Sequence, residues 1–153
     1  MNYWLFKSEP HVFGIDDLER AQTSVWDGVR NYQARNYLRT AQIGDLAFFY
    51  HSSTQPTGIV GTCAIIETNI ADPSQFDPQS KYFDPKSTLV EPRWQTVKVQ
   101  YQSRFPRILS LDELKATFTG DEFALVRKGM RLSVMPVSER VAKRILDLAT
   151  TPS

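Results

Sequence analysis

Five segments of this 153-residue chain have the residue pattern of β-strands, and no helix regularly separates one strand from the next. We expect the strands at Asn2–Lys7, Leu46–His51, Gly58–Glu67, Trp94–Gln102 and Leu132–Met135. Without a strand–helix–strand rhythm, a doubly wound parallel sheet is excluded. The sequence therefore predicts an α+β fold, a small β-barrel with short flanking helices, in a single domain over residues 1–153.

Four short helices are expected around these strands. Ile15–Ala21 begins with two carboxylates, which suit the start of a helix. Asn31–Thr40 carries apolar residues at helical spacing, and a capping box starts a third helix at Ser110. Ser138 can cap the last helix. The apolar stripe expected on that helix consists of Val141, Ile145 and Leu148.

Residues 68–93 form a long segment in which neither a helix nor a strand is expected, because prolines and polar residues interrupt it. A loop of this length in a compact domain is usually functional or mobile. Tyr82 and Phe83 lie in it, and Trp94 follows it. These aromatic side chains could form one wall of a ligand site, or they could simply anchor the loop.

Composition restricts the partners of the chain. The formal net charge is only +1, whereas proteins that follow a nucleic-acid backbone are usually basic, so contact with nucleic acid should be short. The lone cysteine, Cys63, allows neither an internal disulfide nor a thiolate metal site. No apolar run reaches transmembrane length. We expect a cytoplasmic monomer that does not enter a membrane.

Several enzyme motifs are missing. The sequence has no glycine-rich phosphate loop and no Gly-x-Ser-x-Gly elbow. His11 and His51 are its only histidines, and neither has a metal-ligand spacing. We therefore expect no metal ion and no cofactor.

Polar residues beside aromatic ones are the candidates for a binding site. Lys7 and Ser8 end the first strand, where they could line the mouth of a barrel or form a solvated turn. Trp26 offers a flat face for stacking, Asp27 can read a base edge, and Gly28 permits close approach of a ligand. Alternatively, Trp26 plugs the core and Asp27 caps the following helix.

Other polar candidates also have two interpretations. Arg30, Arg35 and Arg39 could meet one or two phosphates, although a solvated helix face is the preferred interpretation of Arg35 and Arg39. His51 follows an apolar run and fits a core or rim position as well as a ligand site. Arg131 and Ser133 share one face of a short strand, which could be an ordinary edge strand.

Four long segments, in order along the chain, resemble the EVE domain family. They are Tyr3–Pro10 (YWLFKSEP), Trp26–Asn36 (WDGVRNYQARN), Gly44–Ser52 (GDLAFFYHS) and Leu125–Val137 (LVRKGMRLSVMPV). The resemblance covers nearly the whole chain. It implies a PUA-like mixed β pseudo-barrel related to the YTH domains, with no cofactor.

The resemblance also implies a function: one modified nucleobase, a modified cytosine in DNA or RNA, swings out of its strand into an aromatic pocket. Trp26 is similar to the cage residue of YTH domains, and the second wall is placed at Tyr82 or Phe83. The remaining residues expected at the ligand are Lys7, Ser8, Asp27, Gly28, Val29, Arg30, Asn31, His51, Ser52, Arg131 and Ser133.

Within this site we expect a division of roles. At least one of four polar side chains should read the base edge, and Arg30 should contact a phosphate. The candidate readers are Asp27, Asn31, His51 and Ser133.

Two other functions stay open from the sequence. Lys7 and Glu9 could imitate the Lys/Glu pair of ASCH-type amidohydrolases, which are PUA-like relatives, if Lys7 lost its proton near neutral pH. The proline-rich loop could instead make the chain a protein-interaction adaptor.

Overall fold

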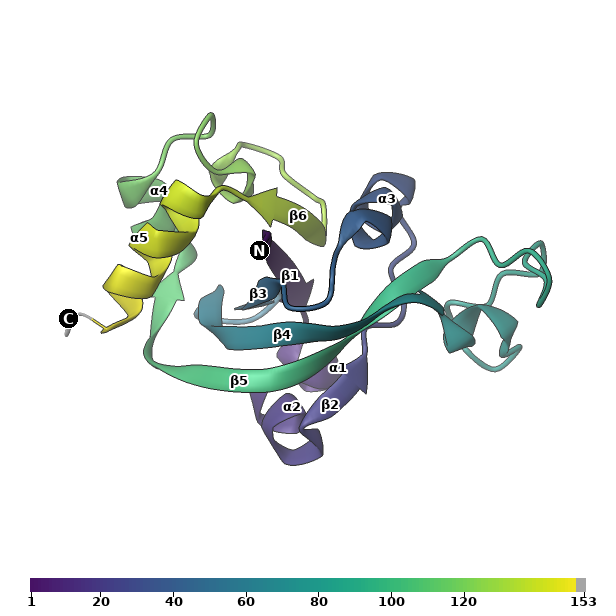
Figure 1. Cartoon of the computed structure of the whole chain (residues 1–153). Helices are drawn as coiled ribbons and strands as arrows, with labels where there is room; N and C mark the ends of the chain where they lie inside the picture. Colours follow the sequence, from purple (N-terminus) through teal and green to yellow (C-terminus); the bar gives the residue numbers. More distant parts are fainter. Residues whose placement is uncertain (151–153) are drawn as a thin grey trace.

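The structure is a computed structural model that describes residues 1–150, and its centre is a six-stranded mixed sheet in the order β2-β5-β4-β3-β1-β6 (Figure 1). The strands are β1 (Tyr3–Ser8), β2 (Thr23–Val25), β3 (Leu46–His51), β4 (Gly58–Ala71), β5 (Gln95–Ser110) and β6 (Val134–Val137). The helices are α1 (Pro10–Phe13), α2 (Ile15–Ala21), α3 (Tyr32–Thr40), α4 (Leu111–Thr117) and α5 (Glu139–Thr150), with short 3-10 turns η1 (Pro73–Phe76) and η2 (Ala124–Val126).

The parallel pair β1 and β3 lies in the middle of the sheet and is buried on both faces. Alternate side chains of β1 enter different cores, so Trp4 and Phe6 face one core while Leu5 faces the other. The side chains of β3 alternate in the same way, so Phe49 faces the first core and Phe48 faces the second. Burial on both faces explains why these strands are continuous apolar runs in the sequence.

Each face of the sheet is covered by its own set of helices. Side chains of α2 and α3, among them Leu18 and Leu38, join one core, and side chains of α4 and α5, among them Leu114 and Ile145, join the other. Each helix thus buries its apolar stripe against the sheet. No helix within residues 1–150 is long and apolar enough to cross a membrane.

The expected β-barrel is corrected in one respect, because the sheet formed by residues 1–150 is not closed. Within the described residues the three-residue strand β2 pairs with β5, and β6 pairs with β1, so each forms an edge of an open sheet. Helix α3 contacts both β5 and β6 and so covers the opening between the two ends of the curved sheet (Figure 1). The α+β class and the PUA-like mixed sheet are confirmed.

Several boundaries differ from the expected ones. β4 and β5 run beyond their expected ends at Glu67 and Gln102, since the ladder between strands includes Ala71 and Ser110. The expected ends fell short because the outward-facing positions of these strands are polar. Strand β2 and the short helix α1 were missed. On α5, Leu148 is partly exposed and Ala149 completes the buried stripe instead.

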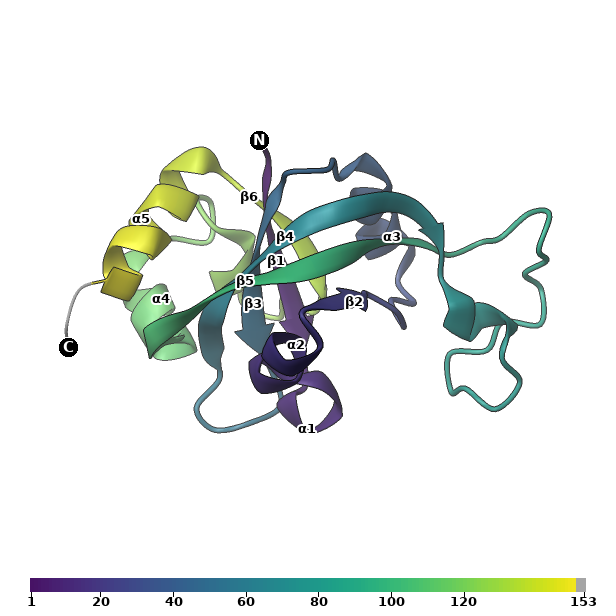
Figure 2. The same ribbon diagram turned by 60° about the horizontal axis from the view of Figure 1, so that its bottom comes forward.

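The segment between β4 and β5, residues 72–94, projects from the body on the side away from α5 and is called the arm below (Figure 2). Buried polar residues hold its base. The Gln75 side chain, fully buried, donates to the backbone oxygens of Asp72 and Trp94 at 2.8 and 2.9 Å. The same side chain accepts from Ser87 Oγ at 2.7 Å. The proline-rich loop is therefore an ordered element.

A second buried polar residue, Asp45, joins the start of β1 to the start of β3. Its carboxylate is 1% exposed and accepts hydrogen bonds from Trp4 Nε1, Asn2 N and Gln42 N at 2.9 to 3.0 Å. Burial alone raises the pKa of Asp45, but these donors outweigh it and hold the pKa below its ordinary value.

We predict that Asp45→Asn lowers the free energy of unfolding at pH 7 by about 1–3 kcal/mol. The NH2 group of the asparagine side chain cannot accept the hydrogen bonds that the carboxylate oxygen in its place accepts. The native pKa of Asp45 is depressed, so its stabilisation is complete above the unfolded pKa and is lost as pH falls through the native value. Urea unfolding at pH 7 and near pH 3 should therefore show the difference between the two proteins shrinking with acid. A difference that grows with acid would contradict this account.

Candidate functional site

A cavity of about 830 Å³ opens between the ends of the sheet, the segment after β2 and the arm. It contains all but two of the residues expected at the ligand. Those that line it are Lys7, Ser8, Trp26, Asp27, Gly28, Val29, Arg30, Asn31, Ser52, Tyr82, Arg131 and Ser133. His51 and Phe83 are not among its lining residues.

Trp26 forms one wall and is also part of the core. Its ring centroid lies 5.2 Å from that of Phe6 and 5.4 Å from that of Phe49, and the residue is only 7% exposed. Its backbone oxygen accepts a hydrogen bond from the Thr96 hydroxyl. Both interpretations of Trp26, the core plug and the cavity wall, therefore describe the same side chain.

Trp26 differs from the other two tryptophans in the hydrogen bonding of its indole nitrogen. Trp4 Nε1 donates to Asp45 at 3.0 Å, and Trp94 Nε1 donates to Asp84 at 2.8 Å. Within residues 1–150 Trp26 Nε1 has no hydrogen-bond partner. Since Trp26 lines the cavity, this N–H group is a donor for whatever enters it.

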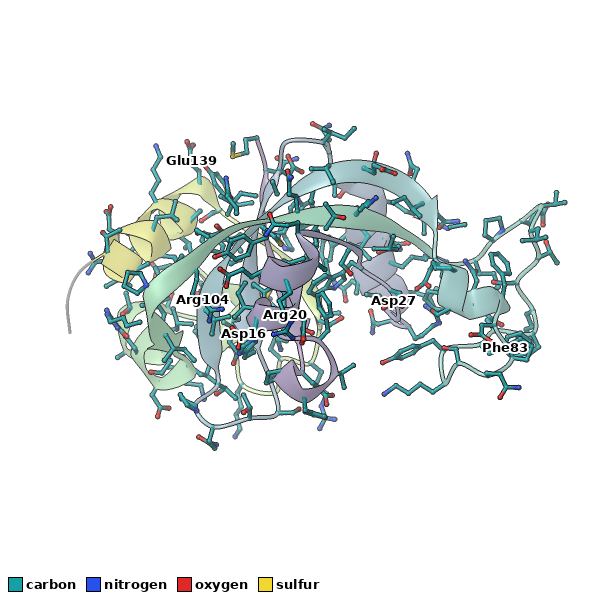
Figure 3. All side chains as sticks on the ribbon, turned by 90° about the horizontal axis from the view of Figure 1, so that it is seen from below. Asp16, Arg20, Asp27, Phe83, Arg104 and Glu139 are labelled. Carbon is teal, nitrogen blue, oxygen red and sulfur yellow. The ribbon has the colours of Figure 1, made fainter. Side chains whose placement is uncertain are left out.

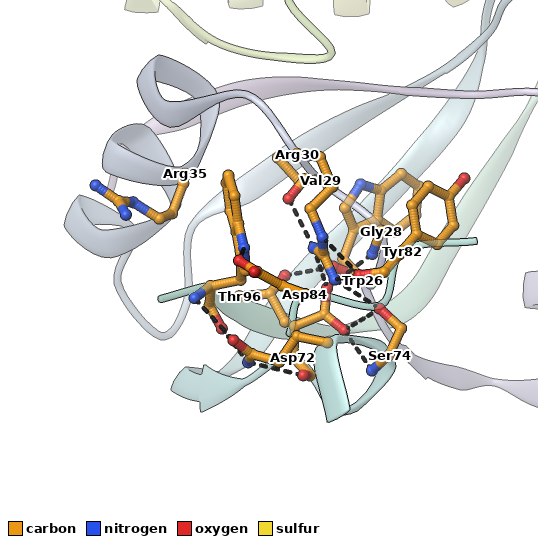
Figure 4. A network of polar contacts seen from close by, with 12 residues as sticks. Trp26, Gly28, Val29, Arg30, Arg35, Asp72, Ser74, Tyr82, Asp84 and Thr96 are labelled. Atoms are coloured by element: carbon orange, nitrogen blue, oxygen red, sulfur yellow. Dashed lines mark hydrogen bonds and ion pairs between the residues drawn. The ribbon is translucent and has the colours of Figure 1, made fainter. Parts of the chain in front are cut away.

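Tyr82 brings a second aromatic ring to the cavity from the arm (Figure 4). Its ring packs directly on Gly28, where a Cβ atom would lie 2.7 Å from it. Gly28 also has a φ of +84°, a conformation that L side chains rarely adopt. The neighbouring Phe83 is 40% exposed and lies on the arm away from the cavity (Figure 3). Of the two candidates for the second wall, the structure brings Tyr82 to the cavity.

Arg30 fixes the position of Tyr82 (Figure 4). Its guanidinium N–H groups donate, at 2.8 to 3.0 Å, to the backbone oxygens of Val29 and Tyr82 and to the side chains of Asp72 and Ser74. All five donors of the group are thus used. Its carbon lies 5.0 Å from the Trp94 ring centroid and 5.6 Å from that of Tyr82. The expectation that Arg30 contacts a phosphate is corrected, because no donor is left for one.

Asp72, at the base of the arm, is the partner that the sequence analysis missed. Its carboxylate, 2% exposed, accepts from Gly28 N at 2.8 Å and from Arg30 at 3.0 Å. Its other oxygen accepts from the backbone N–H and hydroxyl of Ser74. The only local signal was Asp-Pro-Ser, a helix-capping pattern at the start of η1.

Three other expected ligand residues have structural partners. Ser8 Oγ donates to the Phe13 oxygen at 2.5 Å, and Asn31 Oδ1 caps α3 by accepting from Ala34 N at 3.0 Å. His51 Nε2 accepts from Ile15 N at 3.1 Å, outside the cavity lining. Burial lowers the pKa of His51, which favours the neutral ring that this bond requires.

Arg35 and Arg39 attach α3 to the arm and to β5. Arg35 Nη1 donates to the Arg93 oxygen at 2.9 Å, and Arg39 Nε donates to Gln95 Oε1 at 2.6 Å. Tyr32 stacks on Trp94 with ring centroids 4.9 Å apart, so Trp94 anchors the arm. Neither arginine lines the cavity.

Three cations that line the cavity have no ion pair in the described chain. Within residues 1–150, no carboxylate lies within ion-pair distance of Lys7, Lys81 or Arg131. Burial lowers the pKa of Lys7. Lys81 was missed by the sequence analysis, although it directly precedes Tyr82. The described part of the chain contains no cluster of three or more His, Cys, Asp or Glu side chains that could hold a metal ion.

We predict that Arg30→Lys loosens the arm without unfolding the body, because lysine keeps the charge but loses the planar fork. Losing one charged hydrogen bond costs about 1.5–3 kcal/mol, so amide exchange in the arm should accelerate roughly tenfold or more. Hydrogen exchange read by mass spectrometry should show this in residues 72–94 and no change in β1 or β3. Arg39→Lys is the control. Equal acceleration throughout the chain would contradict a local role for Arg30.

The family model that describes the EVE domain matches residues 2–148. Thymocyte nuclear protein 1 of mouse is 39% identical to this chain over 98% of the chain and 74% of its own length. A crystal structure of a protein from Pseudomonas syringae is 46% identical and superposes with a TM-score of 0.92 over 96% of this chain and 99% of that one.

Two further structures extend the comparison. Human thymocyte nuclear protein 1 in complex with 5-methylcytosine-containing DNA is 36% identical and covers 100% of both chains with a TM-score of 0.90. The YTH domain of Mmi1 shares only 9% identity at a TM-score of 0.55, which is a likeness of fold alone. The extent of the family match and the identity to these relatives show that the chain belongs to the EVE domain family.

Proposed function

We propose that this chain is a binding module that holds one modified cytosine from DNA in the cavity between Trp26 and Tyr82. The observation that carries the proposal is the cavity itself, which is lined by the aromatic residues Phe13, Trp26 and Tyr82 together with polar and charged ones. A pocket of this kind can take a small flat ligand. The complex of the human relative with 5-methylcytosine-containing DNA supports a base of this class.

The charges of the cavity fit a short contact with a nucleic acid. Lys7, Lys81 and Arg131 surround it, whereas the whole chain has a net charge of only +1. A strand that places one base in the cavity brings its nearest phosphates toward these three cations. They take the role that the sequence analysis gave to Arg30, so the module needs no extended basic surface.

We predict that Tyr82→Ala weakens binding of a DNA duplex with one 5-methylcytosine roughly tenfold, since stacking on an aromatic side chain is worth about 1–3 kcal/mol per base. Calorimetric titration measures the change. Tyr82 is preferred to Trp26 for this test, because removing the buried Trp26 side chain would also cost about 3–5 kcal/mol of stability.

Phe83→Ala provides the matched control, because it removes the neighbouring aromatic side chain of the arm that does not line the cavity. Its affinity should equal that of the unaltered protein. Equal losses in both variants would mean that the arm, and not a stacked base, determines affinity. No loss in Tyr82→Ala would remove this wall from the binding site.

We infer binding without turnover. Lys7 and Glu9 both line the cavity, but Glu9 pairs with His11 at 3.2 Å rather than with Lys7. Burial raises the pKa of the Cys63 thiol to about 12, so its reactive thiolate is suppressed. Methylated and acylated cytidines incubated with the protein should release no product by chromatography. Product formation abolished by Lys7→Ala would establish the amidohydrolase instead.

A further inference from the structure

A reader of 5-methylcytosine has to reject thymine, which carries the same methyl group at the same ring position. Stacking on Trp26 and Tyr82 cannot separate them, because both bases are flat rings of nearly equal size. Burying the shared methyl group adds about 0.8 kcal/mol in either case. The two bases differ on the edge that bears position 4, where cytosine has an amino group that donates and thymine has an oxygen that accepts. The discriminating group must therefore be a hydrogen-bond acceptor in the cavity.

Few carboxylate or amide oxygens line the cavity, and its serine hydroxyls can donate as well as accept, so they do not separate an amino group from an oxygen. Asn31 Oδ1 is occupied as the cap of α3, and Glu9 is paired with His11. The Asp27 carboxylate differs, because within residues 1–150 its oxygens make no hydrogen bond or ion pair with another residue, and their one hydrogen bond is to the backbone of Asp27 itself. Asp27 directly follows Trp26 and is exposed at the cavity, in the gap between the body and the arm (Figure 3).

The surroundings of Asp27 compensate its charge only in part. Partial burial and then the nearby Asp72 carboxylate raise the pKa of Asp27, and a hydrogen bond to its own backbone and the charge of Arg30 offset this without cancelling it. A ligand that brings an N–H group to the carboxylate relieves this cost, whereas a ligand that brings an oxygen adds to it.

We propose that Asp27 is the specificity-determining residue that accepts a hydrogen bond from the 4-amino group of a methylated cytosine and so excludes thymine. This inference rests on the proposed function of the cavity. Donors for the other two positions of a cytosine edge are present: Trp26 Nε1 and the Lys7 ammonium both lie at the cavity without a hydrogen-bonding partner in the described chain. One acceptor and two donors match the edge of cytosine, and the same set leaves an oxygen of thymine facing a carboxylate.

The test compares Asp27→Asn with the unaltered protein. Four otherwise identical duplexes carry 5-methylcytosine, cytosine, thymine or uracil opposite an abasic site, so that no base pair has to be broken. Fluorescence anisotropy gives the four affinities. We expect the unaltered protein to prefer 5-methylcytosine over thymine by about tenfold or more, the effect of one unsatisfied buried polar group. In Asp27→Asn this ratio should fall to about threefold or less, because the amide can donate to the thymine oxygen.

Glu9→Gln is the matched control, since it neutralises the other carboxylate at the cavity and should leave the ratio unchanged. Preference for methylated over unmethylated bases should persist in Asp27→Asn, because the aromatic walls are intact. An unaltered ratio in Asp27→Asn, or a ratio reduced equally by Glu9→Gln, overturns the assignment of Asp27. Absence of any preference for 5-methylcytosine over the other three bases in the unaltered protein overturns the proposed function itself.

Discussion

The ion pair between Arg30 and Asp72 holds the two sides of the cavity together. It links the segment after β2 to the base of the arm across 42 residues of sequence. Removing two charges from water is expensive, and a buried pair repays that cost only when its other hydrogen bonds are satisfied. Here they are: every guanidinium donor has a partner, and both Asp72 oxygens accept two bonds. Arg30 also donates to the Tyr82 oxygen, so the same side chain that forms the pair positions the aromatic wall opposite the body.

Local patterns predicted the parts of the fold that local interactions determine. β1 and β3 are apolar runs because they are buried on both faces, and α4 begins at its capping serine, Ser110. Strand β2 and the last residues of β4 and β5 were not recognised as strands from the sequence, because pairing with distant segments determines their structure. The sequence also left open whether the barrel closes, because strand count does not show whether the outermost strands pair.

In the candidate site, too, the sequence predicted what local motifs determine and missed what depends on distant partners. Contiguous motifs placed most of the cavity lining, because residues 26–31 and the end of β1 act as units. The roles of individual side chains could not be predicted from the sequence as well as their positions. Arg30 resembled a phosphate ligand until its partners Asp72 and Ser74 were known, and His51 resembled a reader until Ile15 was found to occupy its ring nitrogen. A side chain whose donors and acceptors are already used cannot be recognised from its residue type.

The two sides of the cavity are stabilised by different forces. Trp26 is embedded in an apolar core, whereas the base of the arm buries Asp72, Ser74 and Gln75. Exposure of apolar surface raises the heat capacity and exposure of polar surface lowers it. Detachment of the arm therefore carries a smaller heat-capacity change than unfolding of the body, and its free energy varies with temperature along a flatter curve. The two aromatic walls of the cavity thus belong to parts of the molecule whose stabilities depend differently on temperature.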